Sequence, residues 1–418
     1  MSESTDYTQK SANVSEITLT NFAGKTINLF PNFLGIDIQE DIFVPVVSGN
    51  ITLIDTTNLY ENFPIIGEET ISITYSDFYS KPITRKFSVY GIGAREKTTE
   101  RGSVYVLNFC SEELLHNRIN NYSKSYKDAL VHDIVTDAMS RVKSIKELNI
   151  QQTQELQDFI APNLHPFDVC SQMSNRAIST EGHNGTYLFF EDKEKFNFVS
   201  IEKLIEKPAI SYKIGNAKII GARDPKFILK NYVFMNAANN INGMMTGSQS
   251  VEVKSLDLLH RKVINESYDH FNDEDYSKIN RINSNNPDLK TTSNDYKYKS
   301  KTGLTKLTIT SSEYKSTKNK NMAKRYNSLS TYMNGPKIHA ELPFNSDLTI
   351  GDVVDVSIPQ MDGQKRSDIP EYDKYIQGKY LVTALRQVIG PAQGETVVEL
   401  AKDTYPQSHS DNYAQGQT

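Results

Sequence analysis

A basic stretch in the second half of the chain is the strongest candidate for binding chemistry. Between Lys297 and Arg325, nine Lys or Arg residues occur against a single acid, Glu313. The nine are Lys297, Lys299, Lys301, Lys306, Lys315, Lys318, Lys320, Lys324 and Arg325. Tyr298 and Tyr314 lie among them, and such a row of cations and aromatic rings can bind phosphates and stack on bases. Three roles fit: a strip that binds DNA, a contact with an acidic neighbour, or a solvated polar edge that discourages strand aggregation.

Two clusters of carboxylates could serve in hydrolysis or metal binding, but neither has the sequence surroundings that a catalytic or metal site needs. Glu191, Asp192 and Glu194 share one charged turn between two expected strands. No apolar pocket is expected there to raise a carboxyl pKa, as a hydrolase requires. The Asp-Glu-Asp run at 273–275 lacks the spaced oxygen ligands and the turn glycine of a calcium loop. We therefore expect the first cluster to be a charged hairpin turn without a catalytic role and the second to be a solvated loop.

Two glycine-containing segments resemble fragments of phosphate-binding loops. Residues 91–93, Gly-Ile-Gly, lack a third glycine and a following helix. Residues 24–26, Gly-Lys-Thr, lack the leading glycine, because Leu19 stands at that position. The eight His residues form no His-Glu-x-x-His motif. The sequence therefore predicts a non-enzymatic protein with no catalytic residues, no cofactor and no metal.

Composition indicates a folded protein of several domains, made in a reducing cytoplasm. The chain has 418 residues, of which 38% are hydrophobic and 23% charged, and this length suits two to four domains. Cys110 and Cys170 are the only cysteines and have no zinc-like spacing, so we expect two buried free thiols. The net charge of −5 predicts no general attraction to nucleic acid. Neither a signal peptide nor a membrane span is recognisable, so membrane insertion is not expected.

Hydrophobic periodicity predicts a mainly β fold with α+β parts. Short alternating runs of β-branched and aromatic residues, separated by Gly, Pro and Asn, occur in the first and last parts of the chain. Between them, apolar residues three and four apart predict a helix that begins at Asp128, as N-cap, and reaches Val142. Pro166 opens a second helix, and residues 187–190 and 196–200 predict a hairpin.

The domain organisation follows from these changes in pattern. We predict two tube-like antiparallel β-barrel domains, a small α+β domain and a polar insertion. The predicted ranges are 1–14 for a flexible tail, 15–110 for the first barrel, 111–208 for the α+β domain, 209–255 and 331–405 for the second barrel, 256–330 for an insertion or peripheral domain, and 406–418 for a second flexible tail.

An internal duplication is the most informative feature of the sequence. The two copies of one turn are Ile66, Gly67 and Glu68, and Ile350, Gly351 and Asp352, each leading into an alternating strand. Downstream, residues 86–92 resemble residues 379–385, so two matches occur in the same order. Two ordinary barrels with common turns would explain either match alone. The shared order favours a duplication.

Duplication has a consequence for symmetry. Two similar barrels in each chain of a trimer present six similar units around one axis. Such a ring can match a six-fold partner on one face and a three-fold partner on the other. The pattern therefore predicts a homotrimeric adaptor instead of a catalyst.

Several stretches, taken in order, resemble the central baseplate hub protein of contractile-tailed phages of the T-even type. They are 49–55 (GNITLID), 66–69 (IGEE), the helix opening 166–168 (PFD), 187–191 (YLFFE) and 196–202 (FNFVSIE). The resemblance covers most of residues 15–405 and implies two tube-like barrels per chain in a trimeric, pseudo-six-fold ring. The polar excursion departs from the family pattern.

The resemblance also implies partners and a location. The expected partners are further copies of the chain, the hexameric tail tube protein and the trimeric central spike protein, with baseplate wedge and tape-measure proteins as further candidates. DNA would pass transiently through a central channel, and peptidoglycan cleavage would belong to the separate spike protein. The expected location is the tail baseplate of the virion, after assembly in the host cytoplasm.

Two rival functions stay open at this point. One is the hub of a bacterial contractile injection system, which would share the fold and differ in cargo. The other is a tail-associated peptidoglycan or polysaccharide hydrolase. A hydrolase would need a cleft with two convergent carboxylates, which the sequence does not display.

Overall fold

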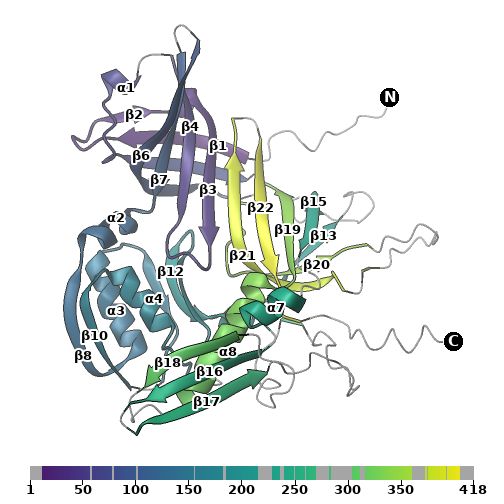
Figure 1. Cartoon of the computed structure of the whole chain (residues 1–418). Helices are drawn as coiled ribbons and strands as arrows, with labels where there is room; N and C mark the ends of the chain where they lie inside the picture. The colour runs from purple at the N-terminus through teal and green to yellow at the C-terminus, as the bar shows by residue number, and fades with distance from the viewer. Residues whose placement is uncertain are drawn as a thin grey trace, which may run out of the picture.

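The protein is described here by a computed structural model. The described residues are 12–56, 59–77, 80–99, 102–154, 156–181, 185–214, 228–235, 240–248, 250–258, 260–269, 282–283, 304–310, 316–359, 372–373, 375–391 and 393–404. Within them the chain is mainly β with α+β parts, as predicted (Figure 1).

The first β unit contains the strands of the N-terminal part of the chain. They are β1 (Ala12–Thr20), β2 (Thr26–Asn28), β3 (Phe33–Asp41), β4 (Ser48–Asp55), β5 (Thr70–Asp77), β6 (Ile83–Thr99) and β7 (Gly102–Cys110), with the short helices η1 (Phe30–Asn32) and α1 (Leu59–Asn62) between strands. Alternate residues such as Ile71, Ile73 and Tyr75 point into one core because successive strand side chains face opposite sides. The predicted strands of this region are confirmed, and β3 was not predicted.

The second β unit is assembled from segments far apart in the chain. Its strands are β13 (Ile210–Ile214), β14 (Ile228–Leu229), β15 (Asn231–Met235), β19 (Lys337–Pro343), β20 (Val353–Ser357), β21 (Gly378–Ile389) and β22 (Gly394–Ala401). Their inward residues form a separate core that includes Ile338, Val356 and Leu400. This unit is not wholly antiparallel, because β13 pairs in parallel with both β14 and β20.

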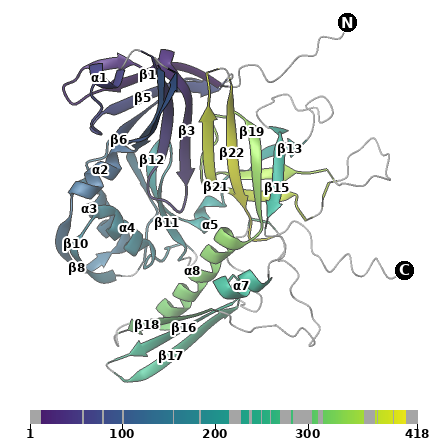
Figure 2. The same ribbon diagram turned by 45° about the horizontal axis from the view of Figure 1, so that its top comes forward.

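The two β units are joined into one sheet. Antiparallel neighbours run without a break in the order β6-β7-β4-β3-β21-β22-β19-β15. Strand β3 belongs to the first unit and β21 to the second, so their pairing is the junction. Figures 1 and 2 show the resulting curved surface, with β6 towards one end and β15 at the other.

An α+β unit lies below the first β unit in Figure 1. Its elements are α2 (Glu112–Ile119), β8 (Tyr122–Leu130), α3 (Val131–Val142), β9 (Glu147–Ile150), β10 (Leu156–Leu164), α4 (Pro166–Ser174), β11 (Tyr187–Glu191), β12 (Lys195–Ser200) and α5 (Ile201–Leu204). The predicted second helix and the hairpin are confirmed. The predicted helix start is wrong: strand β8 continues to Leu130, so Asp128 lies in that strand with a positive φ of 48° and does not cap α3.

A distal unit follows β15. It contains α7 (Asn240–Thr246), a sheet of β16 (Ser250–Asp257), β17 (Lys262–Asp269) and β18 (Leu304–Thr310), and the long helix α8 (Ser316–Asn334) packed on that sheet (Figure 2). Val251, Val253 and Ala323 form a small core between sheet and helix. The boundary predicted at 255/256 falls inside β16, and α8 crosses the one predicted at 330/331. The predicted insertion at 256–330 thus contributes Ala323 to a small core that it shares with Val251 and Val253.

Two further sequence expectations can be compared with the fold. Cys110 and Cys170 are both buried and unbridged, as predicted, and burial raises the pKa of the Cys110 thiol to about 11. None of the helices in the described part of the chain is both long and apolar enough to span a bilayer.

Candidate assembly site at the duplicated strands

The duplicated turns share a backbone conformation that favours glycine. Gly67 has a φ of +93° and Gly351 a φ of +76°, in the left-handed region where a Cβ is unfavourable. A strand follows each turn, and its first hydrogen bond is the same in both copies. Val89 N–H donates to the carbonyl of Glu69 at 2.8 Å, and Val382 N–H donates to that of Asp352 at 2.9 Å.

This hydrogen bond changes one residue in the predicted correspondence. Glu69, and not Glu68, occupies the position equivalent to Asp352, because the first loop is one residue longer. The buried Glu69 carboxylate accepts hydrogen bonds from Ile66 N–H and Gly67 N–H at 2.8 and 2.9 Å. Asp352 accepts one from Thr349 N–H at 3.2 Å. Glu68 is exposed. Each turn is thus closed by an acid at the start of the following strand.

The strand register after the turns is also duplicated. Thr70 pairs with Ser88 in the first unit, as Val353 pairs with Leu381 in the second. A register shift then falls in the same place in both copies, between Val89 and Gly91 and between Val382 and Ala384. A β-bulge at equivalent positions is a specific feature of a fold. The duplication is therefore visible in hydrogen bonding as well as in residue types.

The equivalence extends over five strands on each side. The order β3-β4-β7-β6-β5 in the first unit corresponds to β15-β19-β22-β21-β20 in the second. It ends at the next strand, because β1 is antiparallel to β5 whereas β13 is parallel to β20.

The junction between the units uses one edge of β21 in two ways. The first half of β21 pairs with β20 of its own unit, from Leu381 back to Gly378. The second half pairs with β3 of the other unit, from Ala384 opposite Asp41 to Ile389 opposite Ile36. The junction is head to tail: it joins two different edges of two similar modules.

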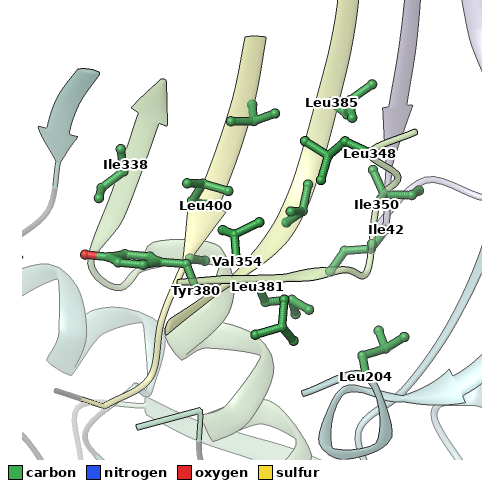
Figure 3. Close-up of a cluster of buried hydrophobic side chains, with 14 of the residues drawn as sticks. Ile42, Leu204, Ile338, Leu348, Ile350, Val354, Tyr380, Leu381, Leu385 and Leu400 are labelled. Carbon is green, nitrogen blue, oxygen red and sulfur yellow. The ribbon is translucent and has the colours of Figure 1, made fainter. Parts of the chain in front are cut away.

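Side chains cross this junction in both directions. Ile42, from the segment after β3, lies in the core of the second unit, near Leu204 and Ile350 (Figure 3). Phe344 and Ile389, from the second unit, lie in the core of the first. Burying apolar groups in each other's cores ties the two units together.

One ion pair crosses the junction and a second lies beside it in the first unit, and their burial differs. Across the junction, the half-exposed Arg386 holds the largely buried Asp37 carboxylate with Nε at 2.8 Å and Nη2 at 2.5 Å. The guanidinium of Arg85 donates to Glu40 at 2.5 Å and is almost fully buried. Desolvation opposes the charge on Arg85, but Glu40 outweighs it and the Arg85 pKa is raised.

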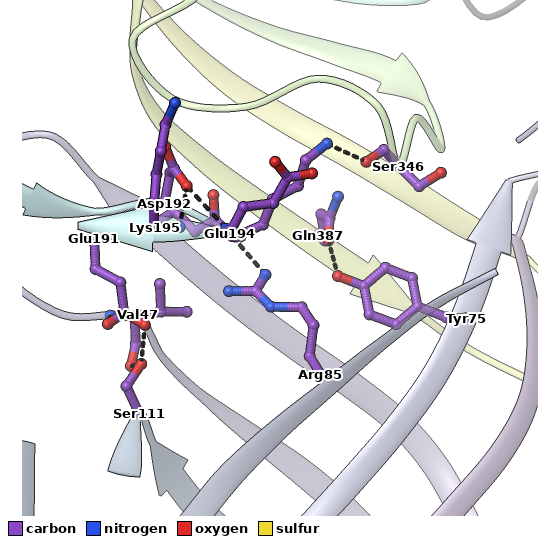
Figure 4. Close-up of polar contacts among 12 residues, drawn as sticks. Val47, Tyr75, Arg85, Ser111, Glu191, Asp192, Glu194, Lys195, Ser346 and Gln387 are labelled. Atoms are coloured by element: carbon purple, nitrogen blue, oxygen red, sulfur yellow. Dashed lines mark hydrogen bonds and ion pairs between the residues drawn. The ribbon is translucent and has the colours of Figure 1, made fainter. Parts of the chain in front are cut away.

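Further hydrogen bonds connect the two units. The Tyr75 hydroxyl donates to the Gln387 side-chain carbonyl at 3.0 Å, inside the protein (Figure 4). Ser346 donates to the Asp77 carboxylate from its N–H at 3.1 Å and from its hydroxyl at 3.0 Å. These bonds join strand β5 to β21 and to the segment after β19, so the junction does not depend on β3 alone.

The acids considered for hydrolysis are structural in this fold (Figure 4). The Glu191 carboxylate is buried, pairs with Lys146, and accepts hydrogen bonds from Ser111 Oγ at 2.7 Å and Val47 N–H at 3.0 Å. Burial raises its pKa, and Lys146 opposes that shift. This cluster fastens the α+β unit to the first β unit. The expectation that nothing there raises a carboxyl pKa by burial is wrong for Glu191, because Val47, Ser111 and Lys146 enclose its carboxylate.

Its two neighbours also serve the hairpin. The Asp192 carboxylate accepts hydrogen bonds from Glu194 N–H and Lys195 N–H, both at 2.8 Å. Asp192 is buried as well. The three acids therefore do not form an exposed pair facing a cleft.

Five of the nine basic residues lie in the described part of the chain, on β18 and α8. Lys297, Lys299, Lys301 and Lys315 lie outside the described residues, as does the acidic run 273–275. Lys318 and Lys320 lie in α8. Lys306, on β18, places its ammonium group 5.0 Å from the ring centre of Tyr326, and Lys324 is half-buried. Within the described part of the chain, no group of three His, Cys, Asp or Glu residues is arranged to hold a metal ion.

Arg325 is removed from the candidate strip by its position. It is buried and donates to the carbonyls of Tyr187 at 2.7 Å and Gly185 at 3.2 Å. Burial lowers its pKa to about 10, partly offset by Glu202. Arg325 thus fastens α8 to the α+β unit and is not available to a phosphate in solution.

Sequence reasoning missed the residues that make the junction. Asp37, Glu40 and Arg386 were not singled out, although Asp37 alternates with Ile36 and Ile38 as strand residues do. Strand β15 was predicted, but its exposed apolar residues Val233 and Met235 were not recognised as a surface.

Comparison with known proteins identifies the class of fold. No family model matches the chain. The tail protein from Neisseria meningitidis MC58 matches with a TM-score of 0.58 at 10% identity, covering 93% of this chain and 96% of that one. The 43 kDa tail protein of prophage MuSo2 from Shewanella oneidensis matches with a TM-score of 0.55 at 10% identity, covering 94% and 100%. The chain therefore has the fold of phage tail proteins.

A sequence relative narrows this class. The chain is 20% identical over 384 residues to the probable baseplate hub protein gp334 of Vibrio phage KVP40, covering 86% of this chain and 87% of the relative. The resemblance to baseplate hub proteins that the sequence predicted is confirmed.

Proposed function

We propose that this chain is a structural subunit of a phage tail baseplate hub, a homotrimer that joins the hexameric tail tube to the trimeric central spike. The observation that carries the proposal is the duplicated five-strand module with its head-to-tail junction. The similarity to the probable hub protein of phage KVP40 supports the same assignment.

The junction explains how a ring would form. A head-to-tail contact leaves one unused edge at each end of the pair. In the described residues, the edge of β6 beyond the β5 pairing has no strand beside it, and neither does the outer edge of β15. These edges are equivalent to the edges of β21 and β3 that pair inside the chain. Repeating the contact between chains extends the sheet, and three chains close it with six similar modules.

Such a ring would have a polar lining. One face of the joined sheet packs on the two cores, and the opposite face carries polar residues that lie directly across neighbouring strands. Asp37, Asn50 and Asn108 form one such row, and Glu399 lies opposite His339 in another. Because the cations beside these rows, Arg386 and Lys337, are each paired with an acid, such a lining would offer DNA little adhesion. This supports a channel through which DNA passes.

The proposal assigns a mechanical and non-enzymatic role. The hub would nucleate the tube, hold the spike and bear load in the virion, with assembly in the host cytoplasm. Wedge and tape-measure proteins would be further neighbours. The hub of a bacterial injection system would need the same geometry, and neighbouring genes for a capsid distinguish the phage hub from it.

Light scattering on the purified full-length chain tests the proposal. We expect a stable species with three times the chain mass of 47.3 kDa at micromolar concentration, alone or with the spike protein of the same virus. Obligate interfaces of this kind bury about 2,000 Å² or more. A monomer under both conditions would contradict the proposal.

A further inference from the structure

We infer which surfaces of two neighbouring copies meet and in which register, a deduction that rests on the proposed homotrimer. An acceptor surface consists of the β6 edge with Ile66 and Tyr90. A donor segment consists of β15 and α7, with Val233, Met235, Ile241 and Met245 exposed. The donor segment of one copy docks on the acceptor surface of the next.

The pairing inside the chain fixes the register of the contact between chains. Through their partners on β4 and β19, Ile36 and Asp37 of β3 correspond to Tyr232 and Val233 of β15. By this correspondence, β15 of one copy takes the place of β3 beside the β6 edge of the next copy, and it runs in the same direction as β3.

The other strand of the contact is mapped in the same way. Through their partners on β22 and β7, Val388 and Ile389 of β21 correspond to Glu96 and Lys97 of β6. Strand β6 has an additional register shift between Ile92 and Arg95, and the mapped residues Glu96 and Lys97 lie after that shift. Because Val388 lies opposite Asp37 in the chain, Glu96 of one copy lies opposite Val233 of the next.

The acceptor surface exposes apolar side chains at positions whose equivalents in the second unit are covered by other parts of the chain. Ile66 is 59% exposed, whereas the equivalent Ile350 is 1% exposed. Leu204 and Ile42 lie beside Ile350 (Figure 3), and Ile42 N–H donates to the carbonyl of Thr383 at 3.0 Å. Tyr90, at the position of Thr383 in the bulge, is 53% exposed. Within the described residues, the first unit thus lacks the cover that the second unit has.

The donor segment supplies apolar groups at the matching place. Val233 is 56% exposed, and Ile241 and Met245, one helical turn apart on α7, are 74% and 69% exposed. Inside the chain, the C-terminal end of β3 points towards Thr383 and Ile350. In the mapped register, the C-terminal end of β15 points in the same way towards Tyr90 and Ile66 of the next copy. Exposed apolar surfaces on both sides are expected of an interface between copies.

A cysteine pair placed in this register tests the inference. Directly opposed residues of antiparallel strands are about 4.5–5.5 Å apart at Cα, which a disulfide can bridge. The full-length variant carrying Glu96→Cys and Val233→Cys is oxidised mildly and run on a denaturing gel without reductant. We expect covalent dimers and trimers. Each single variant, and the pair Glu96→Cys with Val263→Cys on the exposed face of β17, should give no trimer band.

The outcomes separate this inference from the proposed function. A trimer by light scattering that does not cross-link at Glu96 and Val233 refutes the register and leaves the proposed function standing. A monomer refutes both. Equal cross-linking in the Val263 control also refutes the register.

A second variant tests the apolar contact without cysteines. Ile66→Glu adds a charge to the exposed acceptor surface, so the fold should tolerate it while the trimer dissociates at least tenfold more readily. Ile145→Glu, at a 98% exposed position outside the proposed contact, is the matched control and should leave dissociation unchanged. An unchanged trimer in Ile66→Glu overturns the contact.

Discussion

The two β units differ less in how they fold than in what covers them. Both contain the same five strands, the same bulge and the same glycine turn. The turn at Gly351 is packed under Leu204 of the α+β unit, whereas a Cβ added at Gly67 would meet the backbone of Tyr90, which belongs to its own unit. Duplication thus preserved the hydrogen-bond ladder, and substitutions at the surface gave each copy a different neighbour. We propose that the more exposed copy is where the neighbouring chain docks.

A buried ion pair present in only one unit should give the largest difference between them. Gly378 stands in the second unit at the position of Arg85, so that unit has no equivalent of the Arg85–Glu40 pair. Glu40→Ala leaves a buried guanidinium without its partner, and we expect a loss of about 3–5 kcal/mol of unfolding free energy. Urea denaturation measures it.

The surface pair at the same junction is the control for this effect. Arg386→Ala removes the partner of Asp37 from a half-exposed position, and we expect a loss of about 1 kcal/mol or less. Similar losses in Glu40→Ala and Arg386→Ala would show that burial at the junction does not matter.

The glycine turns should respond unequally to the same substitution. Alanine at either position meets a positive φ, at a cost of about 1–2 kcal/mol. At Gly351 the added Cβ also lies 3.2 Å from Leu204 Cδ2, whereas at Gly67 the nearest atom is 3.6 Å away. We expect Gly351→Ala to lose about 1 kcal/mol more than Gly67→Ala. Equal losses would contradict the difference in covering.

A smaller and pH-dependent difference is expected at the end of the duplicated sheet. Lys402 N–H donates to the carbonyl of Pro336 as Ser111 N–H donates to that of Val47, so the two residues are equivalent. Lys402 is buried against the carbonyls of Tyr375 and Ile376, and desolvation lowers its pKa to about 7. The unfolded state therefore binds more protons than the folded state between about pH 7 and 10, and stability should rise with pH across this window.

Lys402→Met removes that titration. The difference in unfolding free energy between the wild-type chain and this variant, measured by denaturation from pH 6 to pH 10, should change in favour of the wild-type chain as pH rises. A difference that is constant with pH would mean that Lys402 keeps its ordinary pKa in the fold.

The sequence predicted the repeated part of the fold because repetition lies in local pattern. Glycine at a positive φ and alternating strand residues recur at 66–73 and 350–358, and residue types alone are sufficient to find them. The exact correspondence needed hydrogen bonds, since one additional residue in the first loop shifts the acid from Glu68 to Glu69. Strand β3 was missed because it contains several acidic residues, which are infrequent in strands. In the fold, partners near the junction, such as Arg386 for Asp37, pair with these acids.

Other features depend on contacts between distant segments and could not be predicted from local pattern. Arg325 belongs to a basic run, and only the packing of α8 against Tyr187 shows that it is buried. Glu191 was expected in a charged turn with no apolar pocket around it, yet Ser111 and Lys146 enclose it. The parallel pairing of β13 depends on chain topology, which periodicity does not encode.

An image of the purified full-length oligomer by electron microscopy, viewed along its symmetry axis, tests the central claim most directly. We predict a closed ring of six similar β modules contributed by three chains, with continuous strand density at the contacts between chains as at the junction inside each chain. Three separated lobes, or modules in contact through surfaces other than β6 and β15, would contradict it.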